Sequence, residues 1–438
     1  MLQTVRNAFK IKEIRNRIIF TFLMLIVVRL GSQIPAPGIN GEYFSSWFSE
    51  NSGNAFGFFD AVTGGSFENM SVFALSITPY ITSSIIIQLL TIAIPKFEEW
   101  QKDGEDGRKK LTAITRYLTV GLALMESLAM AIAFGRQGLL TDFNALNVIM
   151  MVITLTAGSA VIMWIGERIT ERGVGNGISI VLTINIISRI PSDLSTLFEQ
   201  FVKGKEIATA VLNAAIIVAI IVLVVVLVVL LQGAEHRIPV QYSRKVMGRK
   251  QVGGQSSQIP LKVNTAGVIP IIFAQSLMMF PVIICQMLGK TGDTSVWGKI
   301  LNMLTQSNWF DFNTPINNIG LAIYIVLVIA FAYFYTSITF NPLEVADNLK
   351  KQGGFIPGIR PGKPTSDYLT RMLNYIIFIG AVGLVIVAII PIFFEGVFNA
   401  DVSFGGTSLI IIVGVIIETL KQIESQMLVR NYKGFLND

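Results

Sequence analysis

One segment constrains the fold more than any other feature of the sequence. From Ala214 to Leu231 the chain carries no polar side chain. An α-helix rises about 1.5 Å per residue, so this segment covers most of a hydrocarbon core roughly 30 Å thick. Since a helix that is apolar on every side has little use in a soluble protein, the segment predicts a membrane span. Only 14% of the chain is charged, against about 25% in soluble domains, which extends this prediction to the whole protein.

Apolar stretches of similar length recur along the chain. Backbone polar groups find no partners in lipid, so each spanning stretch has to be helical. The first stretch is not a cleavable signal, because Arg29 and Pro35 follow it and no small-residue cleavage site is present. We predict an all-α polytopic membrane protein with ten transmembrane helices, of which the fifth and tenth give the weakest signals: Ile18–Ile34, Val72–Ile94, Leu111–Phe134, Val148–Ile165, Ile178–Ile190, Val211–Leu231, Ala266–Leu288, Ile319–Phe340, Leu373–Phe394 and Leu409–Leu428.

The distribution of lysine and arginine orients these spans. If the loops alternate between two sides, 27 of the 34 basic residues lie on one side and six on the other, with Arg29 inside the first span. Loops rich in Lys and Arg stay in the cytoplasm, so both termini are predicted to be cytoplasmic. That arrangement requires an even number of spans, which favours ten over nine or eleven.

Few side chains are available for enzyme chemistry. The chain has one cysteine, Cys285, within an apolar run, and one histidine, His236, in a basic loop. One residue of each type provides no metal cluster and no nucleophile–base pair, and the sequence contains no phosphate-binding loop. Glu126 is the only clearly mid-span acid, and its role is left open. We expect no catalysis, no metal and no cofactor.

Seven sequence strings, in order along nearly the whole chain, carry a family resemblance. They are RLGSQIPAPG (29–38), PYITSSIIIQLL (79–90), GEDGRKK (104–110), TERGVGNGIS (170–179), PLKVNTAGVIP (260–270), NPLEVADNLKKQGGFIPGIRPG (341–362) and FGGTSL (404–409). Each resembles the corresponding stretch of the bacterial SecY family, the channel subunits of the Sec protein translocon. The resemblance implies two pseudo-symmetric inverted halves of five helices with the pathway between them. The expected divisions are a cytoplasmic segment (1–17), a first half (18–190), a second half (191–428) and a cytoplasmic tail (429–438).

The resemblance also implies a function. A passive protein-conducting channel in the bacterial cytoplasmic membrane would translocate unfolded secretory polypeptides and release membrane-protein helices sideways into the bilayer. Its implied partners are SecE-type and SecG-type small membrane subunits, the SecA ATPase, the ribosome, signal peptides and membrane lipids, with the ATPase or the ribosome supplying the energy. The alternative is a small-solute secondary transporter, which the shortage of ionisable groups within the spans and the large basic loops disfavour.

An external loop at about residues 53–70 combines glycines with phenylalanines and has no Lys or Arg. Its four glycines make a poor, easily remodelled helix, while the phenylalanines favour contact with an apolar surface. On its residues alone, the segment could be an ordinary external loop. The resemblance implies instead a short plug helix, a removable stopper that includes Phe58, Phe59, Gly64, Gly65 and Phe67.

The resemblance implies a pore ring of six aliphatic side chains: Ile81, Ile85, Leu182, Ile186, Ile272 and Ile411. The first two are four residues apart, as are the next two, so each pair lies on one helix face. An aliphatic ring gates by dewetting, because ions do not shed their hydration to cross it. Without the family resemblance, each of these residues would be interpreted as a packing or lipid-facing side chain.

A sideways exit needs a seam that opens toward lipid, and the resemblance places it between the second and third spans and the seventh and eighth. Gln88 and Asn264 are polar residues in or near this region. They could form a hydrogen-bonded latch, or they could make routine helix–helix hydrogen bonds worth about 0.6 to 2 kcal/mol each. The sequence leaves both interpretations open.

Two cytoplasmic loops, at about 233–263 and 341–371, are long, basic and rich in Gly and Pro. Their basic residues attract lipid headgroups and set topology, and the resemblance adds docking of SecA and the ribosome. Pro357–Gly362 predicts a rigid turn that holds Arg360 out to solvent, where its charge also suits rRNA phosphates. The candidate docking residues are Arg360, Arg244, Lys245, Arg249, Lys250, Lys350 and Lys351.

Overall fold

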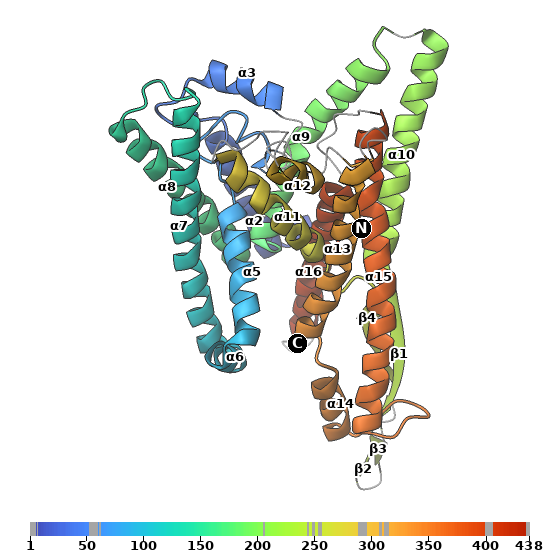
Figure 1. Ribbon diagram of the computed structural model, residues 1–438. Coiled ribbons are helices and arrows are strands. Elements are labelled where there is room, and N and C mark those ends of the chain that lie inside the picture. The colour runs from blue at the N-terminus through green and yellow to red at the C-terminus, as the bar shows by residue number, and fades with distance from the viewer. Residues whose placement is uncertain are drawn as a thin grey trace.

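The computed structural model describes residues 6, 8–51, 60, 63–204, 206–242, 245–247, 250–252, 256–287, 296–305, 309–310, 315–398 and 406–434. Most of the described chain is helical (Figure 1). Its helices are α2 (Lys12–Gly31), α3 (Gly41–Asn51), α5 (Thr78–Ala93), α6 (Pro95–Lys102), α7 (Glu105–Arg136), α8 (Ala145–Arg172), α9 (Gly177–Phe201), α10 (Ile207–Gly233), α11 (Ile269–Met287), α12 (Val296–Leu304), the 3-10 turn η2 (Pro315–Asn317), α13 (Asn318–Thr339), α14 (Pro342–Lys351), α15 (Lys363–Phe398) and α16 (Gly406–Gly434).

Each of the ten predicted spans overlaps a helix, namely α2, α5, α7, α8, α9, α10, α11, α13, α15 and α16. The second span, Val72–Ile94, is helical only from Thr78, since residues 72–77 form turns. Within the described ranges, six helices are long and apolar enough to cross a membrane by length and composition, or seven if the bent pair α5–α6 counts as one span. The axis of α6 turns by 103° from that of α5 at Pro95, whose ring blocks continuation of the preceding helix.

Helix α9 extends beyond the predicted fifth span, Ile178–Ile190. It begins at the cap residue Asn176, whose side-chain oxygen accepts hydrogen bonds from the backbone N–H groups of Ile178 and Ser179. It then continues through Pro191 to Phe201. A proline removes one backbone hydrogen bond and disfavours a helix interior, but here the remaining contacts of the helix outweigh that local preference. Helix α9 is therefore one continuous helix on both sides of Pro191.

The apolar core divides along the sequence. One cluster of buried side chains draws its members from residues 36–155, and a second from residues 224–410. A third cluster combines residues of both parts, including Val181 and Ile186 from α9 and Ile411 from α16. Helices α9 and α16 pack against each other, and α7 contacts α11. The two parts of the chain therefore have separate cores and meet in a shared apolar cluster.

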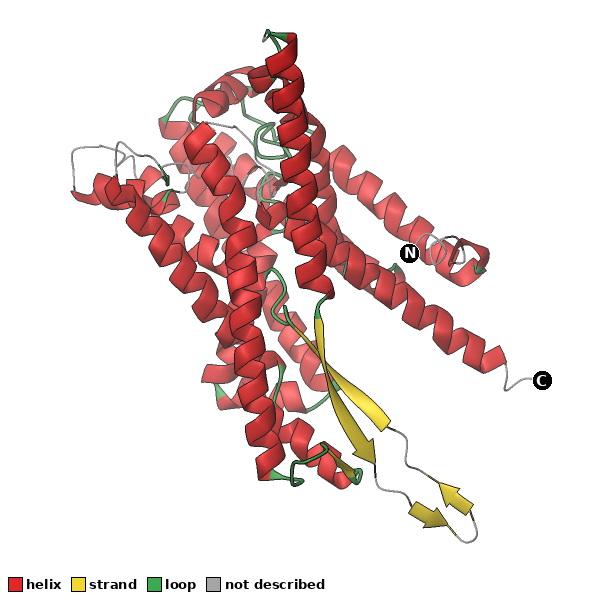
Figure 2. Cartoon of the chain, turned by 90° about the vertical axis from the view of Figure 1, so that its right-hand side faces the viewer, coloured by secondary structure: helices red, strands yellow, loops and turns green. Residues whose placement is uncertain are grey.

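A β-hairpin extends from one end of the helix bundle (Figure 2). Strand β1 (Glu235–Tyr242) pairs antiparallel with β4 (Ser256–Lys262) and with the short β5 (Gly354–Phe355). Strands β2 (Lys245–Met247) and β3 (Lys250–Val252) pair at its tip. Figure 1 shows α6, α14 and this tip at one end of the molecule, and α3 and the α9–α10 turn at the other. The loop at 233–263 is thus a structured projection rather than an irregular connection.

Candidate functional site

Five of the six predicted ring residues lie in the apolar cluster shared by the two parts of the chain. Leu182, Ile186 and Ile411 are buried members with exposures of 6%, 2% and 6%, and Ile81 and Ile272 pack against them half-buried. They come from α5, α9, α11 and α16. Side chains separated by up to about 330 positions in the sequence therefore meet at one place, rather than facing lipid independently.

A cavity of about 510 Å³ with both polar and apolar walls lies against this cluster. The sixth ring candidate, Ile85, lines it together with Ile81 and Ile272, and its polar wall includes Arg116, whose Nε donates to Glu167 Oε1 at 2.7 Å. Arg116 belongs to the basic loop and helix start that the charge distribution assigns to the cytoplasm. The cavity therefore opens on the predicted cytoplasmic side, and the aliphatic side chains form its inner limit.

On the other side of the cluster lies the described part of the predicted plug. Asp60 and Thr63 have helical backbone, while residues 64–70 form turns. Phe67 is fully buried and packs edge-on against Phe44 of α3, with ring centroids 5.9 Å apart, and it also contacts Phe134 of α7. Phe58 and Phe59 lie outside the described residues. Phe67 thus finds the apolar surface that the sequence predicts, in an aromatic cluster rather than among the ring residues.

Gly64 fits against α9 because it has no side chain. Its φ of +70° belongs to the left-handed region, and a Cβ placed there would lie 2.6 Å from the backbone oxygen of Asn185 and 2.7 Å from its Cα. Gly65 also has a positive φ, +81°, but its nearest neighbour would be an Arg189 nitrogen at 3.8 Å. A residue with a Cβ would be strained at the φ of Gly64 and would clash with the backbone of α9, so only glycine fits this position. The backbone of this segment therefore rests directly on α9.

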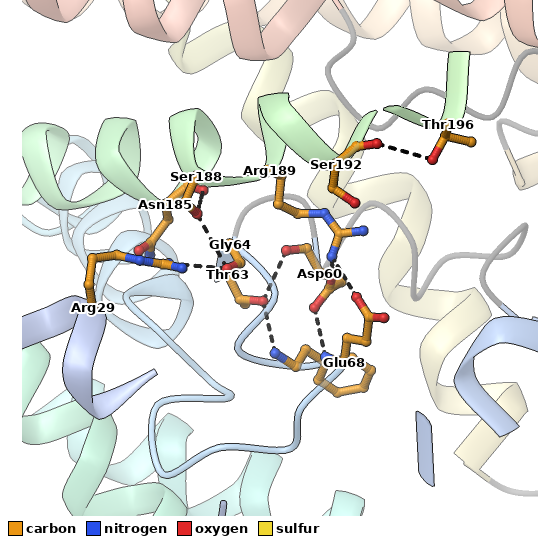
Figure 3. Close-up of polar contacts among 11 residues, drawn as sticks. Arg29, Asp60, Thr63, Gly64, Glu68, Asn185, Ser188, Arg189, Ser192 and Thr196 are labelled. Atoms are coloured by element: carbon orange, nitrogen blue, oxygen red, sulfur yellow. Dashed lines mark hydrogen bonds and ion pairs between the residues drawn. The ribbon is translucent and has the colours of Figure 1, made fainter. Parts of the chain in front are cut away.

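A set of polar contacts, drawn in Figure 3, attaches the same segment to α2 and α9. The carbonyl oxygen of Gly64 accepts hydrogen bonds from Arg29 Nη1 at 3.1 Å and from Ser188 Oγ at 3.4 Å. Arg189 pairs with the carboxylate of Asp60, which is 0% exposed, and with Glu68 Oε2 at 3.0 Å. Asp60 Oδ1 also accepts from the backbone N–H of Glu68 at 2.7 Å. Burial raises the pKa of the Glu68 carboxyl above its usual value.

Sequence reasoning missed this contact set. The sequence indicates no role for Arg189 beyond its charge, and none for Asp60 and Glu68, the two acids of the glycine-rich segment (the external loop at about residues 53–70). The available signal was the presence of Asp60 and Glu68 in an otherwise uncharged external loop, because a charge next to apolar residues needs a partner. Their partner, however, lies 129 residues away from Asp60, so no local pattern identifies it.

Comparison with known proteins decides the family. A family model described as SecY matches residues 71–420. The chain belongs to the SecY family. Among its relatives, the protein translocase subunits SecY of Halalkalibacterium halodurans and Bacillus subtilis are each 43% identical to it, over 443 and 446 residues, with 100% of both chains covered.

Solved structures place the fold in the same family. A structure of a protein-conducting channel matches with a TM-score of 0.61 and 17% identity, covering 97% of each chain. Sec61 in a canine ribosome–channel complex from the endoplasmic reticulum matches with a TM-score of 0.58 and 16% identity, also over 97% of each chain. These matches confirm the predicted fold class, an all-α polytopic membrane protein of the SecY/Sec61 architecture.

Among the described residues, no hydrogen bond joins Gln88 to Asn264, the two polar residues predicted for a lateral gate. Gln88 lines the cavity, and its Nε2 lies 3.5 Å from Ser84 Oγ of the same helix. Asn264 is buried in the turn after β4, and its Nδ2 has no hydrogen-bond partner among the described residues. In the described chain, buried oxygens of Glu126 on α7 and Gln275 on α11 also lack partners. Helices α7 and α11 contact each other between the two parts of the chain. Each of them therefore carries a buried polar atom without a hydrogen-bond partner among the described residues.

The predicted docking residues that the structure describes lie at the end of the molecule that carries the hairpin. Arg360 is exposed, between Gly358 and Gly362, whose φ values are +83° and +100°; Thr365 Oγ1 closes this turn by donating to the Arg360 carbonyl at 2.8 Å. Lys350 and Lys351 are exposed in the last turn of α14. Lys245 and Lys250 lie on β2 and β3, whose side chains are not described, while Arg244 and Arg249 lie outside the described residues.

Proposed function

We propose that this chain is the central subunit of a protein-conducting channel, which translocates unfolded polypeptides and releases apolar helices into the bilayer. One observation carries the proposal. Along α9, Ser179 lines the cavity, Leu182 and Ile186 lie in the shared apolar cluster, and Ser188 and Arg189 contact the glycine-rich segment. Cavity, aliphatic constriction and stopper therefore follow one another along a single helix, in the order that a gated pathway requires.

The aliphatic constriction contributes to the resting seal by a simple physical effect, and the stopper completes that seal. A gap lined by alkyl side chains is too apolar to hold water, so an ion would have to lose its hydration shell to pass. Alkyl side chains make no directional hydrogen bonds and can close around a moving peptide of any sequence. A small-solute transporter would instead need fixed polar groups for its solute, and the comparisons give that alternative no support.

The finer assignments follow from the family and from the charge distribution. Sequence relatives are named protein translocase subunits, and one structural relative is a channel bound to a ribosome. We propose docking of a SecA-type ATPase or a ribosome at the hairpin and the Arg360 turn, and assembly with SecE-type and SecG-type subunits. The docked partner supplies the energy, since the channel itself catalyses nothing. We also propose a bacterial cytoplasmic membrane location with cytoplasmic termini.

Site-specific crosslinking to a stalled chain tests the channel proposal. A photo-crosslinking amino acid replaces Ile81 or Ile411 in the ring, or Val226 of α10, an exposed residue of a helix with few buried positions. A secretory polypeptide stalled during export is expected to crosslink at the two ring positions and not at Val226. Efficient export without crosslinks at either ring position would refute the proposed pathway.

A further inference from the structure

The glycine-rich segment carries a charge that its environment does not require for packing. Asp60 is completely buried, and its carboxylate is held by Arg189 of α9. Phe67 already supplies apolar contact with the aromatic cluster around Phe44. A buried ion pair adds little to stability compared with an apolar contact, but it specifies one arrangement, because removing either partner leaves an uncompensated buried charge. The ion pair therefore determines the position of the segment against α9, whereas the apolar contacts keep the segment bound.

Arg189 is positioned to sense the constriction. Leu182, Ile186 and Arg189 are separated by four and three residues, the spacing of a single helix face. A polypeptide that displaces the two ring side chains therefore acts on the face of α9 that holds Asp60. The adjoining residue Asn185 donates from Nδ2 to Ser76 Oγ at 3.0 Å, before α5, and Ser188 donates to the Gly64 carbonyl of the segment.

The two charges also have alternatives once they separate. Asp193, one turn beyond Arg189 on α9, is buried and acts electrostatically on the guanidinium, so Arg189 keeps a counter-charge when Asp60 leaves. Asp60 would regain water if its segment moved into an aqueous vestibule. Separation therefore leaves neither charge buried without compensation, which is what a reversible contact needs.

We propose that the Arg189–Asp60 ion pair is an autoinhibitory clasp that keeps Asp60 and residues 63–70 in the resting position and is released when the ring is displaced. This inference rests on the proposed channel function. The clasp predicts two states of the segment, held and released, whose ratio depends on the ion pair. Weakening the pair raises the released fraction at rest, without damaging the pathway used during export.

The test uses the full complex with its partner subunits in proteoliposomes and compares Asp60→Asn, Arg189→Gln and the double variant. Asparagine keeps an acceptor for the Glu68 N–H, so Asp60→Asn removes the charge and preserves the local turn. Each variant is expected to raise resting ion permeability at least tenfold and to retain export of a secretory substrate. The double variant, which buries no unpaired charge from this pair, is expected to leak no more than either single variant, as the non-additivity of one shared interaction requires.

Glu68→Gln is the matched control. Its side chain is 40% exposed, and it contacts the same guanidinium, so its loss should raise the permeability far less than Asp60→Asn does. Maleimide labelling of Ser66→Cys, a 2% exposed position, in a Cys285→Ser background should become at least tenfold faster when combined with Asp60→Asn. Normal export with unchanged permeability and unchanged labelling would overturn the clasp and leave the channel proposal standing. Failure of the wild-type complex to export would overturn both.

Discussion

Replacing Gly64 with alanine tests whether the glycine-rich segment really rests against α9. An alanine at φ +70° pays the left-handed penalty of about 1–2 kcal/mol. Its Cβ also meets the Asn185 carbonyl oxygen at 2.6 Å and Cα at 2.7 Å. Both of these are helix backbone atoms, which cannot rotate away as a side chain can, so overpacking adds about 1–3 kcal/mol.

These costs apply to the resting position, because a displaced segment can relax both the dihedral angle and the clash. The resting state of Gly64→Ala is therefore expected to lose about 2–5 kcal/mol relative to the displaced state. Since about 1.4 kcal/mol corresponds to a tenfold change in a population ratio, the displaced fraction should rise by at least about tenfold. Ion flux through the reconstituted complex at rest measures this fraction.

Alanine variants of two other glycines separate the cost of backbone strain from the cost of the clash with α9. Gly65→Ala has the same kind of strain at φ +81°, but its nearest contact is the end of the flexible Arg189 side chain at 3.8 Å. It should leak less than Gly64→Ala. Gly138, at φ +75°, has open space around its Cβ position and lies outside the segment, so Gly138→Ala should not leak. Equal permeability of the Gly64 and Gly65 variants would refute the contact with α9.

Two further predictions concern other parts of the molecule. Arg360→Glu should reduce binding of a SecA-type ATPase or a ribosome at least tenfold and leave thermal stability unchanged, because Arg360 is exposed. The control is Lys203→Glu, a charge reversal at an exposed residue beyond the far end of α9. Equal loss of binding in both variants would contradict the docking surface. Asn176→Ala removes the cap of α9 and should lower the free energy of unfolding by about 1 kcal/mol, as measured by thermal unfolding in detergent. Asn176→Ser keeps a capping oxygen and should retain most of that stability. An unchanged transition in the alanine variant would contradict the capping role.

Hydropathy and charge located the spans well because lipid leaves the backbone no alternative to the helix. The apolar run within α10 is the clearest example, and its helix extends from Ile207 to Gly233. The length of α9 was less accessible, because Pro191 is a strong local signal for a helix boundary and only tertiary contacts overrule it. Sequence reasoning also missed the hairpin, because the buried side chains of β1 and β4 pack with residues of α14 and α15, which lie far away in the sequence.

The candidate site also has a part that the sequence predicts and a part that only the folded chain shows. The four-residue spacing of Leu182 and Ile186 predicts a shared face, but only the folded chain brings Ile411 to them. The clasp was beyond sequence reasoning, because its charges lie on segments that the sequence gives no reason to pair. Gln88 and Asn264 illustrate the opposite case: residue type and approximate location suggested a contact, and the structure places Gln88 at the cavity and Asn264 in a separate turn.

Helix α9 assigns sealing and release to different kinds of side chain. Leu182 and Ile186 exclude water and ions without directional bonds, so they tolerate any passing sequence. Apolar contact alone would hold the stopper in many similar positions, since burial depends on area and not on direction. An ion pair such as that of Arg189 with Asp60 specifies one position and exchanges readily for water once the segment moves. In the proposed mechanism, both kinds of side chain lie on one face of α9, so movement at the constriction would be conveyed to the stopper through this helix.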